Sequence, residues 1–383
     1  MVNKKEFFVI FLFVFSIISC ESKKTEEKPV EINYEATPSL CFFEAFDFES
    51  AELVFFEGGD EVVLSSNLEI RKGENNFVVF DKAQNQIFLF GKEGNLIRMI
   101  GRSGRGPGEY INPSFIDVDF EEREIYVLNK NGFSIARFSF EGNYFDSIEI
   151  PVYASSFATT GSNTFVCYSG YYGDPNGYRV HFIKDTTLIH SILPLNTSAL
   201  DVIEPNFFPA TGNRGLFRET FFPEVYEYEK DGLTELLRFD FGRLSVTESD
   251  LVKAGDPFNF FNEINNRGFA TTRSAYKGRN HIVVRTMQQS NGENVESYFI
   301  INPDDILAVK VSSNKPNAGL DEDDFRSLNL FAVDENDVAY FIAEPHIINK
   351  GFFRSQSRVF QSAHVPDQEN PVIIKVPISN RDE

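Results

Sequence analysis

The chain has 383 residues, which is enough for two or three domains of ordinary size or for one large repeat architecture. Hydrophobic residues make up 42% of it and charged residues 24%, values that fit a globular protein and exclude a disordered or collagen-like one. The 57 Asp and Glu residues outnumber the 36 Lys and Arg residues, so the net charge is −21. This balance argues against nucleic acid or an anionic membrane surface as a partner, and it favours a cationic or neutral one.

The first twenty residues have the pattern of an export signal. Lys4 and Lys5 precede an apolar run over residues 7–18, which is too short to span a membrane but suits a signal peptide. Cys20 follows this run, and the arrangement resembles a bacterial lipoprotein signal. The resemblance implies that residues 1–19 are removed and that Cys20 is the lipid attachment site, so that the membrane is a partner only through this lipid. The alternative is an ordinary secretory signal with an incidental cysteine.

Residues 20–39 are charged, contain proline and have almost no apolar side chains. Such a segment buries too little surface to order itself, so we expect a flexible tether that leads to a folded domain over residues 40–383. Cys41 and Cys167 lie in this domain, and neither belongs to a zinc-binding spacing. They could pair in an oxidising compartment. Two free thiols are the favoured interpretation, because cysteines far apart in sequence specify no disulfide geometry.

From about residue 40 onward, short apolar runs alternate with turn sequences. The runs are rich in Phe and β-branched residues, which strands prefer, and Gly, Asn and Asp in the turns are typical of hairpins. The runs include FVVFD (77–81), QIFLF (86–90), EIYVLN (124–129), FSIARFSF (133–140), NTFVCY (163–168), HIVVRTM (281–287), ESYFII (296–301) and VAYFIA (338–343). Residues 246–255 have the nearest approach to a helical pattern and predict one short helix. The domain is therefore expected to be almost entirely β.

A 48-residue repeat indicates the architecture. Shifting the chain by 48 residues places Asp81 on Asn129 and residues 93–95 on residues 141–143, both Glu-Gly-Asn, without a gap. Repeats of about this length with several strands each are typical of propeller blades, in which ring closure protects the sheet edges. Degenerate copies follow at 225–242 and 296–311.

The length of the chain predicts the number of blades. Roughly 325 residues follow residue 59, which is enough for six or seven repeats, and long inserts over 199–222 and 250–268 favour six. We therefore predict an all-β propeller of six four-stranded antiparallel blades. Two tandem β-sandwiches would not explain the ungapped register. To close the ring, a strand from residues 50–72 is expected to join the blade that contains residues 337–378.

The segment over residues 100–145 carries a family resemblance. Its Gly-Arg-Gly-Pro-Gly-Glu-Tyr run at 104–110, Pro113, Asp117 and Arg-Phe-x-x-x-Gly-Asn hairpin resemble the six-bladed β-propeller lipoproteins of Bacteroidetes, relatives of the NHL-repeat and TolB-like propellers. The resemblance implies a lipid-anchored protein of the cell envelope, on the outer membrane and facing either the periplasm or the surface. Most such proteins have no established activity, so the resemblance informs fold and location more than function.

The Gly-rich residues 101–110 are the most conspicuous candidate for ligand contact. They match neither a phosphate-binding P-loop nor a dinucleotide-binding motif. The favoured interpretation is a tight crossing between blades, in which glycine adopts positive φ angles. Such a crossing would place charged side chains at one mouth of the ring. The ligand-binding residues that we predict there are Arg102, Arg105, Glu109 and Tyr110.

No pattern assigns catalysis, a metal or a cofactor. The acidic residues at 304–305 and 321–324 lack the spacing of an EF-hand, the five histidines form no metal motif, and no nucleophile elbow is present. A binding or scaffolding module for a protein, small-molecule or glycan ligand is therefore the first hypothesis. A propeller lyase or hydrolase with a metal on the axis is the alternative, and it requires three or more His, Asp or Glu side chains that converge at the channel. Aromatic residues expected to be exposed for binding are Phe207, Phe208, Phe221, Phe222, Phe258, Phe260 and Phe261.

Overall fold

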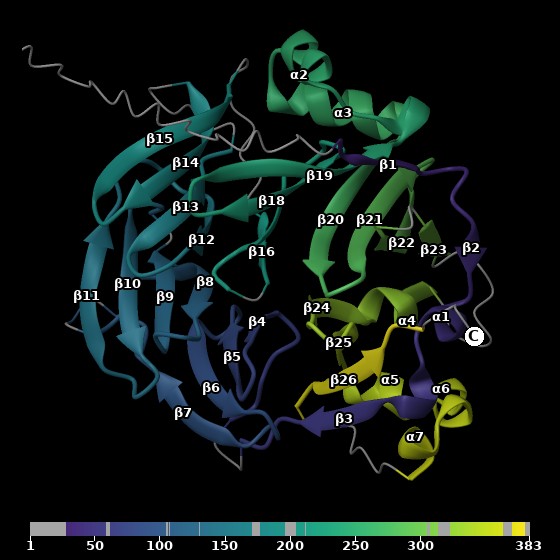
Figure 1. Cartoon of the computed structure of the whole chain (residues 1–383), viewed down its shortest axis with the longest axis horizontal. Coiled ribbons are helices and arrows are strands. Elements are labelled where there is room, and N and C mark those ends of the chain that lie inside the picture. The colour runs from purple at the N-terminus through teal and green to yellow at the C-terminus, as the bar shows by residue number, and fades with distance from the viewer. Residues whose placement is uncertain are drawn as a thin grey trace, which may run out of the picture.

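The computed structural model describes residues 28–58, 62–104, 106, 108–129, 131–170, 177–195, 204–210, 212–304, 307–312, 322–362 and 370–379. Within these residues, six sheets surround a central axis, as predicted (Figure 1). The innermost strands of the sheets are β4 (Leu68–Lys72), β8 (Pro113–Asp119), β12 (Ser156–Thr159), β16 (Phe207–Pro209), β20 (Phe269–Lys277) and β24 (Asn329–Val333). Each contacts the next around the ring, and β24 also contacts β4. The protein is therefore a closed six-bladed propeller.

Each blade continues outward from its innermost strand by antiparallel pairing. Blade 1 adds β5 (Asn76–Asp81), β6 (Gln86–Gly91) and β7 (Leu96–Ile100), and blade 2 adds β9 (Glu124–Asn129), β10 (Ser134–Ser139) and β11 (Tyr144–Glu149). Blade 3 adds β13 (Thr164–Tyr168), β14 (Tyr178–Lys184) and β15 (Thr187–Pro194), and blade 4 adds β17 (Gly215–Arg218), β18 (Glu224–Glu229) and β19 (Gly232–Asp240). Blade 5 adds β21 (Ile282–Ser290), β22 (Glu293–Asn302) and β23 (Leu307–Ser312), and blade 6 adds β25 (Val338–Ala343), β26 (Val372–Pro377) and β3 (Glu52–Phe55).

The 48-residue repeat corresponds to blades 1 and 2. Strands β5 and β9 begin and end 48 residues apart, and so do β6 and β10. The repeated Glu-Gly-Asn turn places Gly94 and Gly142 at φ angles of 90° and 81°, a region that glycine enters without steric cost. The repeat therefore marks equivalent strands and turns.

The ring closes in the way that the sequence predicts. Strand β3, near the N-terminal end of the fold, is the outermost strand of blade 6 and pairs antiparallel with β26, near its C-terminal end. Val54 lies opposite Ile373 in this pairing, and both side chains are buried. The prediction that a strand from residues 50–72 joins the last blade is thus confirmed.

Part of the predicted tether is ordered, which corrects the expectation for residues 20–39. Strand β1 (Val30–Asn33) pairs parallel with β19, and β2 (Ser39–Leu40) pairs parallel with β23, so blades 4 and 5 each have a fifth strand. Ile32 is buried against the core between these blades, so its apolar side chain provides the burial that a tether lacks. Residues 1–19 and Cys20 lie outside the described residues.

Helices are more numerous than the sequence predicts. The expected helix forms as α2 (Glu248–Ala254), after the 3₁₀ turn η3 (Gly242–Leu244), and α3 (Pro257–Arg267) follows it at the rim (Figure 1). The start of α3 is well defined, since Asp256 accepts a hydrogen bond from the Asn259 N–H at 3.0 Å. The other helical segments among the described residues are α1 (Phe42–Ala45), η1 (Phe48–Ser50), α4 (Glu322–Ser327), α5 (Pro345–Ile348), α6 (Gly351–Gln356) and α7 (Arg358–Ser362). Each of these segments spans six residues or fewer, too few to show a periodic pattern.

The segment 199–222, predicted as an insert, contains β16 and β17, the two inner strands of blade 4. The prediction was wrong because strands of three and four residues show little alternation. Five of the seven aromatic residues expected to be exposed in the two predicted inserts, 199–222 and 250–268, are buried, namely Phe207, Phe208, Phe221, Phe222 and Phe260. Only Phe258 and Phe261 lie on the surface.

Aromatic side chains fill the space between blades. Phe239 of blade 4 meets Phe299 of blade 5 edge to face at 5.1 Å, and Tyr126 of blade 2 meets Phe165 of blade 3 at 5.3 Å. Such pairs add stabilisation beyond the area they bury, which accounts for the high Phe content. Cys41 and Cys167 are both free thiols, in agreement with the favoured interpretation.

Candidate ligand-binding site in the central channel

The Gly-rich segment connects β7 to β8 and has a structural role. Arg102 Nε lies 2.7 Å from Glu109 Oε1, and Glu109 Oε2 accepts a hydrogen bond from the Gly106 N–H at 2.7 Å. The Tyr110 side chain is fully buried and packs edge to face against Phe138 between blades 1 and 2. The predicted ligand contact by Tyr110 is therefore replaced by a packing role, because its side chain does not reach solvent.

The other predicted ligand-binding residues do not converge on a cavity. Arg102 and Glu109 contact each other, and neither lines the central channel. Arg105 lies outside the described residues. Ligand contact by Arg102 and Glu109 thus stays a prediction, and their positions outside the channel lining give it no further support.

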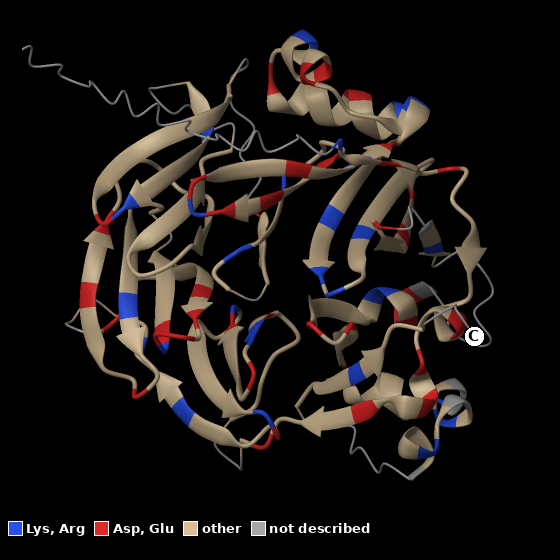
Figure 2. Ribbon diagram, viewed as in Figure 1, with Lys and Arg blue, Asp and Glu red and all other residues tan. Residues whose placement is uncertain are grey.

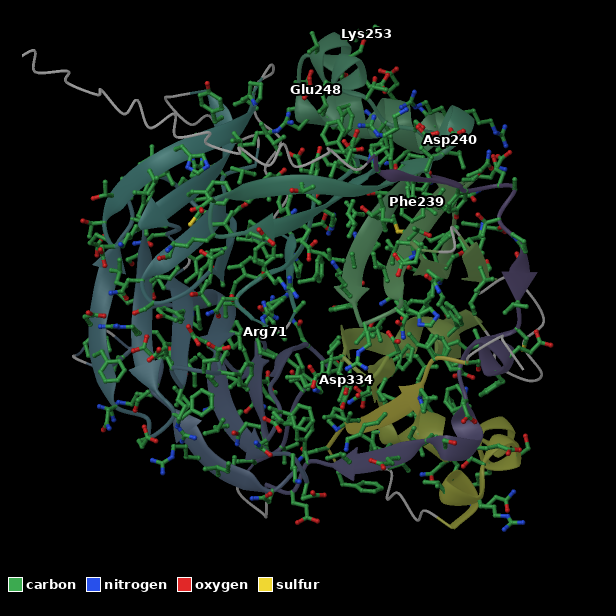
Figure 3. The ribbon with its side chains drawn as sticks, in the orientation of Figure 1. Arg71, Phe239, Asp240, Glu248, Lys253 and Asp334 are labelled. Atoms are coloured by element: carbon green, nitrogen blue, oxygen red, sulfur yellow. The ribbon has the colours of Figure 1, made fainter. Side chains whose placement is uncertain are left out.

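A large cavity lies on the propeller axis. It has a volume of about 1250 Å³ and is bordered by the inner strands and their loops. This volume is sufficient for a small-molecule ligand, because such pockets usually measure roughly 300–1,000 Å³. Residues of both charge signs occur on the inner strands and their loops (Figure 2), and the labelled Arg71 and Asp334 lie near the centre of the ring (Figure 3).

The channel differs from the whole chain in its charge balance. Its lining contains eight basic residues, namely Arg71, Lys72, Lys82, Arg123, Arg214, Arg218, Arg273 and Arg285. It contains seven acidic residues, namely Glu69, Glu74, Asp117, Glu121, Glu204, Asp334 and Glu335. The whole chain has 36 basic and 57 acidic residues, so basic side chains are enriched in the channel.

One charge cluster joins the inner strands of blades 1 to 3. On β4, Arg71 Nη2 lies 2.7 Å from Glu69 Oε1, and Arg71 Nε lies 3.1 Å from Asp117 Oδ1 on β8. The other oxygen of Asp117 accepts a hydrogen bond from the Thr159 N–H of β12 at 2.7 Å. Lys82 Nζ lies 2.8 Å from Glu69 Oε2. The cluster contains two positive and two negative groups and is therefore balanced.

Burial perturbs the ionisation of several groups in the channel wall. It raises the pKa of Asp117 to about 6, although the neighbouring Arg71 acts in the opposite direction. It also lowers the pKa of Lys72, whose ammonium group lies 3.7 Å from Asp334 and 4.8 Å from the centre of the Tyr340 ring. Since the side chains of Asp117, Lys72 and Asp334 are largely buried in the wall, electrostatic interactions among these groups are stronger than in bulk water.

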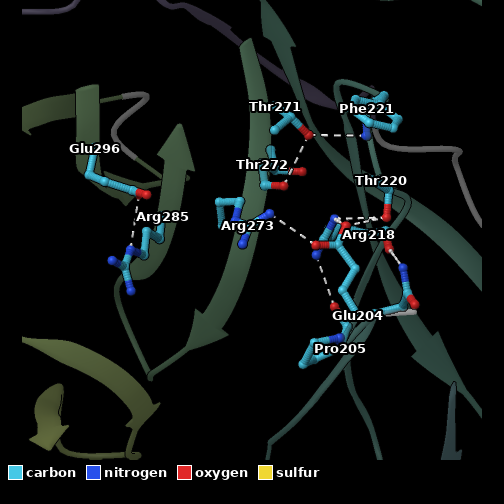
Figure 4. Close-up of polar contacts among 11 residues, drawn as sticks. Glu204, Pro205, Arg218, Thr220, Phe221, Thr271, Thr272, Arg273, Arg285 and Glu296 are labelled. Atoms are coloured by element: carbon cyan, nitrogen blue, oxygen red, sulfur yellow. Dashed lines mark hydrogen bonds and ion pairs between the residues drawn. The ribbon is translucent and has the colours of Figure 1, made fainter. Parts of the chain in front are cut away.

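A second cluster lies between blades 4 and 5 (Figure 4). Glu204 Oε1 lies 2.6 Å from Arg218 Nη1, and Glu204 Oε2 lies 3.1 Å from Arg273 Nη1. Thr220 donates a further hydrogen bond to Glu204, and Arg218 donates one to the Pro205 carbonyl at 3.0 Å. Burial opposes the ionisation of Glu204, but the two arginines hold its pKa below the usual value. One carboxylate here faces two guanidinium groups.

A β-bulge determines where Arg273 lies. The pairing of β20 with β21 shifts between Thr272 and Ser274, which leaves Arg273 without a partner residue on β21. Bulges bend a strand and redirect a side chain, and they are frequent beside functional sites. Arg273 therefore reaches the channel while its neighbours continue the sheet.

Sequence reasoning missed these clusters, although a signal was present. Charges recur at alternate positions in two short segments that are otherwise apolar, with Glu69 and Arg71 in residues 68–71 and Asp117 and Asp119 in residues 115–119. Residues two apart in a strand lie on one face, so this pattern indicates a charged face within a buried strand. Buried charges require partners of opposite charge, and the wall of a central channel is one place where charges from neighbouring strands can pair.

The described residues contain no group of three or more His, Cys, Asp or Glu side chains arranged to hold a metal ion. No histidine lines the channel within the same residues. The arrangement can therefore bind a ligand by ion pairing, hydrogen bonding and aromatic contact. Its lining also contains the Tyr340 hydroxyl, which donates a hydrogen bond to Asp334 at 2.8 Å. In the portion of the chain described by the structure, no helix is long and apolar enough to cross a membrane.

Fold and site together define a six-bladed β-propeller with a polar, ion-paired central channel. The chain belongs to the family described as Domain of unknown function (DUF4934), whose model matches residues 28–377. Among solved structures, it is similar to a Bacteroides fragilis protein described as exported, with a TM-score of 0.73, 13% identity, and coverage of 92% of this chain and 100% of that one. This level of identity supports the fold alone.

A second solved structure has a weaker similarity. A member of the DUF4221 family from Bacteroides vulgatus has a TM-score of 0.49 and 11% identity, with coverage of 87% of this chain and 99% of that one. A similarity with this TM-score supports no conclusion about the fold or function of the chain. The search of curated proteins found no match.

Proposed function

We propose that this protein is an exported binding or scaffolding module whose ligand enters the central channel. The observation that carries the proposal is the cavity of about 1250 Å³ on the axis, with buried ion-pair clusters in its wall. Rigid, preorganised polar groups around a cavity are typical of ligand-binding sites. The ligand is a small molecule, a glycan or a segment of a partner protein, and nucleic acid is not expected because the chain is strongly acidic.

The alternative, an enzyme with a metal on the axis, requires several ligating side chains that converge. In the described ranges, four acidic residues of the channel are instead paired with Lys or Arg, namely Glu69, Asp117, Glu204 and Asp334. Binding is therefore the function that this geometry supports best.

We further propose that lipid at Cys20 anchors the protein to the cell envelope, at the outer membrane. The signal-like residues 1–19 and the similarity to a protein described as exported support this location. Since β1 begins at Val30, only the nine residues 21–29 separate Cys20 from the propeller. Nine residues span at most roughly 30 Å, so the anchor would hold the ring close to the membrane surface.

The Cys20→Ser variant tests the anchor. The substitution removes the thiol available for acylation and leaves the export signal intact. We expect the variant to be exported but to leave the membrane pellet, as measured by fractionation of cells and immunoblotting. Cys41→Ser is the matched control, since it removes a free thiol within the fold, and it should stay in the pellet. A Cys20→Ser protein that remains membrane-bound in high salt would contradict lipid anchoring.

The Ser66→Trp variant tests the channel as the binding site. Ser66 is exposed in the channel lining, so a large ring there narrows the cavity with little cost to folding. Ser147→Trp on β11, the outermost strand of blade 2, is the matched control because that serine is exposed away from the channel. The proteins are incubated with envelope extract, and bound molecules are identified by native mass spectrometry. We expect Ser66→Trp to lose the ligand that the native protein and Ser147→Trp retain, whereas equal retention by all three would overturn the proposed site.

A further inference from the structure

We infer that the ligand of the central channel carries an oxyanion, a carboxylate or a phosphate, and that Arg273 binds it. This inference rests on the proposed function, because it names the chemical class of the ligand that the channel would take. It also reverses the expectation from the net charge of the chain, which favours a cationic or neutral partner.

The charge balance of the individual clusters is the first argument. Arg71 and Lys82 face Glu69 and Asp117, Lys72 faces Asp334, and Arg285 faces Glu296 at 3.1 Å, so each of these groups is neutral as a whole. The Glu204 cluster has two guanidinium groups for one carboxylate. Among the clusters described in the channel wall, it is the one with a surplus positive charge.

The surplus charge is available on Arg273 and not on Arg218. The Arg218 side chain is 1% exposed and contacts Glu204, Thr220 and the Pro205 carbonyl. The Arg273 side chain is 44% exposed, and its Nη1 contacts Glu204. For its Nε and Nη2, the described part of the chain provides no hydrogen-bond acceptor. These N–H groups can therefore donate to a ligand.

The geometry of Arg273 favours a planar or branched oxyanion. A guanidinium group presents two parallel N–H bonds, which match two oxygens of a carboxylate or phosphate, and such charge-assisted pairs are among the stronger hydrogen bonds. Glu204 already holds one end of the group, so less side-chain freedom is lost when a ligand binds. The bulge at Arg273 directs the group into the channel from β20 (Figure 4).

The net charge of −21 does not prevent this binding. Charges separated by more than the Debye length, which is roughly 8 Å at physiological ionic strength, are largely screened from one another. The local balance at Glu204, Arg218 and Arg273 therefore decides what binds there. The overall charge acts mainly on the association rate. At very low salt, anions should therefore associate more slowly with this chain than with a chain of zero net charge.

The test compares two arginines that are equally exposed and also paired with glutamate. Arg273→Gln removes the proposed contact, and Arg238→Gln removes the same charge from β19 at the rim, where the Arg238 side chain is 45% exposed and pairs with Glu224 and Glu235. Binding of D-glucuronate, inorganic phosphate and the uncharged D-glucose is measured by isothermal titration calorimetry. We expect at least one anion to bind and Arg273→Gln to weaken it about ten-fold or more, with Arg238→Gln unchanged.

The three probes distinguish the sources of the oxyanion. Binding of D-glucuronate alone assigns a carboxylate, and binding of phosphate alone assigns a phosphate group. Equal binding of D-glucose and D-glucuronate, anion binding that Arg273→Gln leaves unchanged, or no binding of either anion at millimolar concentration would each overturn the inference. If Arg273→Gln does not fold, Arg273→Lys replaces it, since lysine keeps the charge but lacks the paired N–H groups and should weaken binding to a smaller extent.

Failure of this inference is distinguishable from failure of the proposed function. An uncharged ligand that the native protein retains and Ser66→Trp loses would leave the channel as the binding site and overturn only the assignment of an oxyanion. Retention of all ligands by Ser66→Trp would overturn the channel itself.

Discussion

Removal of residues 1–66 is expected to abolish cooperative folding of the propeller. The deletion takes away β3, so β26 becomes an unpaired edge and the ring opens. It also removes Phe42, Phe46 and Phe48, which are buried in the core beside blade 6. Each such Phe contributes about 3–5 kcal/mol, and native domains have only about 5–15 kcal/mol in total. Circular dichroism during thermal unfolding should show no sharp transition, whereas a midpoint within a few degrees of the full chain would contradict the prediction.

A pair of proline substitutions separates ring closure from the general loss of a strand. Val54→Pro acts on β3, and Ile148→Pro acts on β11, which is also the outermost strand of its blade; both side chains are buried. A hairpin links β11 to β10, whereas β3 is held to β26 without a nearby covalent connection. Val54→Pro should therefore lower the unfolding midpoint more than Ile148→Pro. Equal losses would show that closure through β3 has no special weight.

Substitution of Arg71 by Met is expected to destabilise the fold by about 3–5 kcal/mol at neutral pH, because it leaves the Asp117 carboxylate buried without its guanidinium partner. Chemical denaturation measures the loss. Arg238→Met is the control and should cost no more than about 1 kcal/mol, since that ion pair is exposed on β19. The double variant Arg71→Met with Asp117→Asn should recover most of the stability, because the uncompensated charge is then absent.

The loss of stability in Arg71→Met should depend on pH, because the Asp117 carboxyl is responsible for it. The pKa of Asp117 is raised to about 6 in the folded protein, above the ordinary value of 3.8, so protonation favours the folded state. This contribution is complete below pH 3.8 and is lost as the pH rises through about 6. Without Arg71 the pKa rises further, and the difference between native protein and Arg71→Met should shrink from about pH 8 to about pH 5. A difference that is constant over this range would show that lost packing, not charge, is responsible.

Local sequence determined the strands, the turns and the architecture of this protein. The 48-residue repeat matches β5 with β9 and β6 with β10, because short apolar runs and Glu-Gly-Asn turns are read from neighbours in sequence. Ring closure through residues 50–72 also followed from the sequence, since a propeller leaves one edge that a terminal strand has to cover. The inner strands of blade 4 were missed, because β16 and β17 are too short to show a pattern.

Only the tertiary structure decided which side chains meet on the axis. Arg71 and Asp117 are 46 residues apart, and Arg273 and Glu204 are 69 apart, yet each pair lies within hydrogen-bond distance. Tyr110 stands in the most conspicuous motif of the sequence and is nevertheless buried between blades. The physical reason is that a strand pattern fixes the face on which a side chain lies, whereas its partner depends on how neighbouring blades pack and on where a bulge redirects the chain. Whether a charge becomes a structural pair or remains available to a ligand, as at Arg218 and Arg273, depends on burial that the closed ring alone establishes.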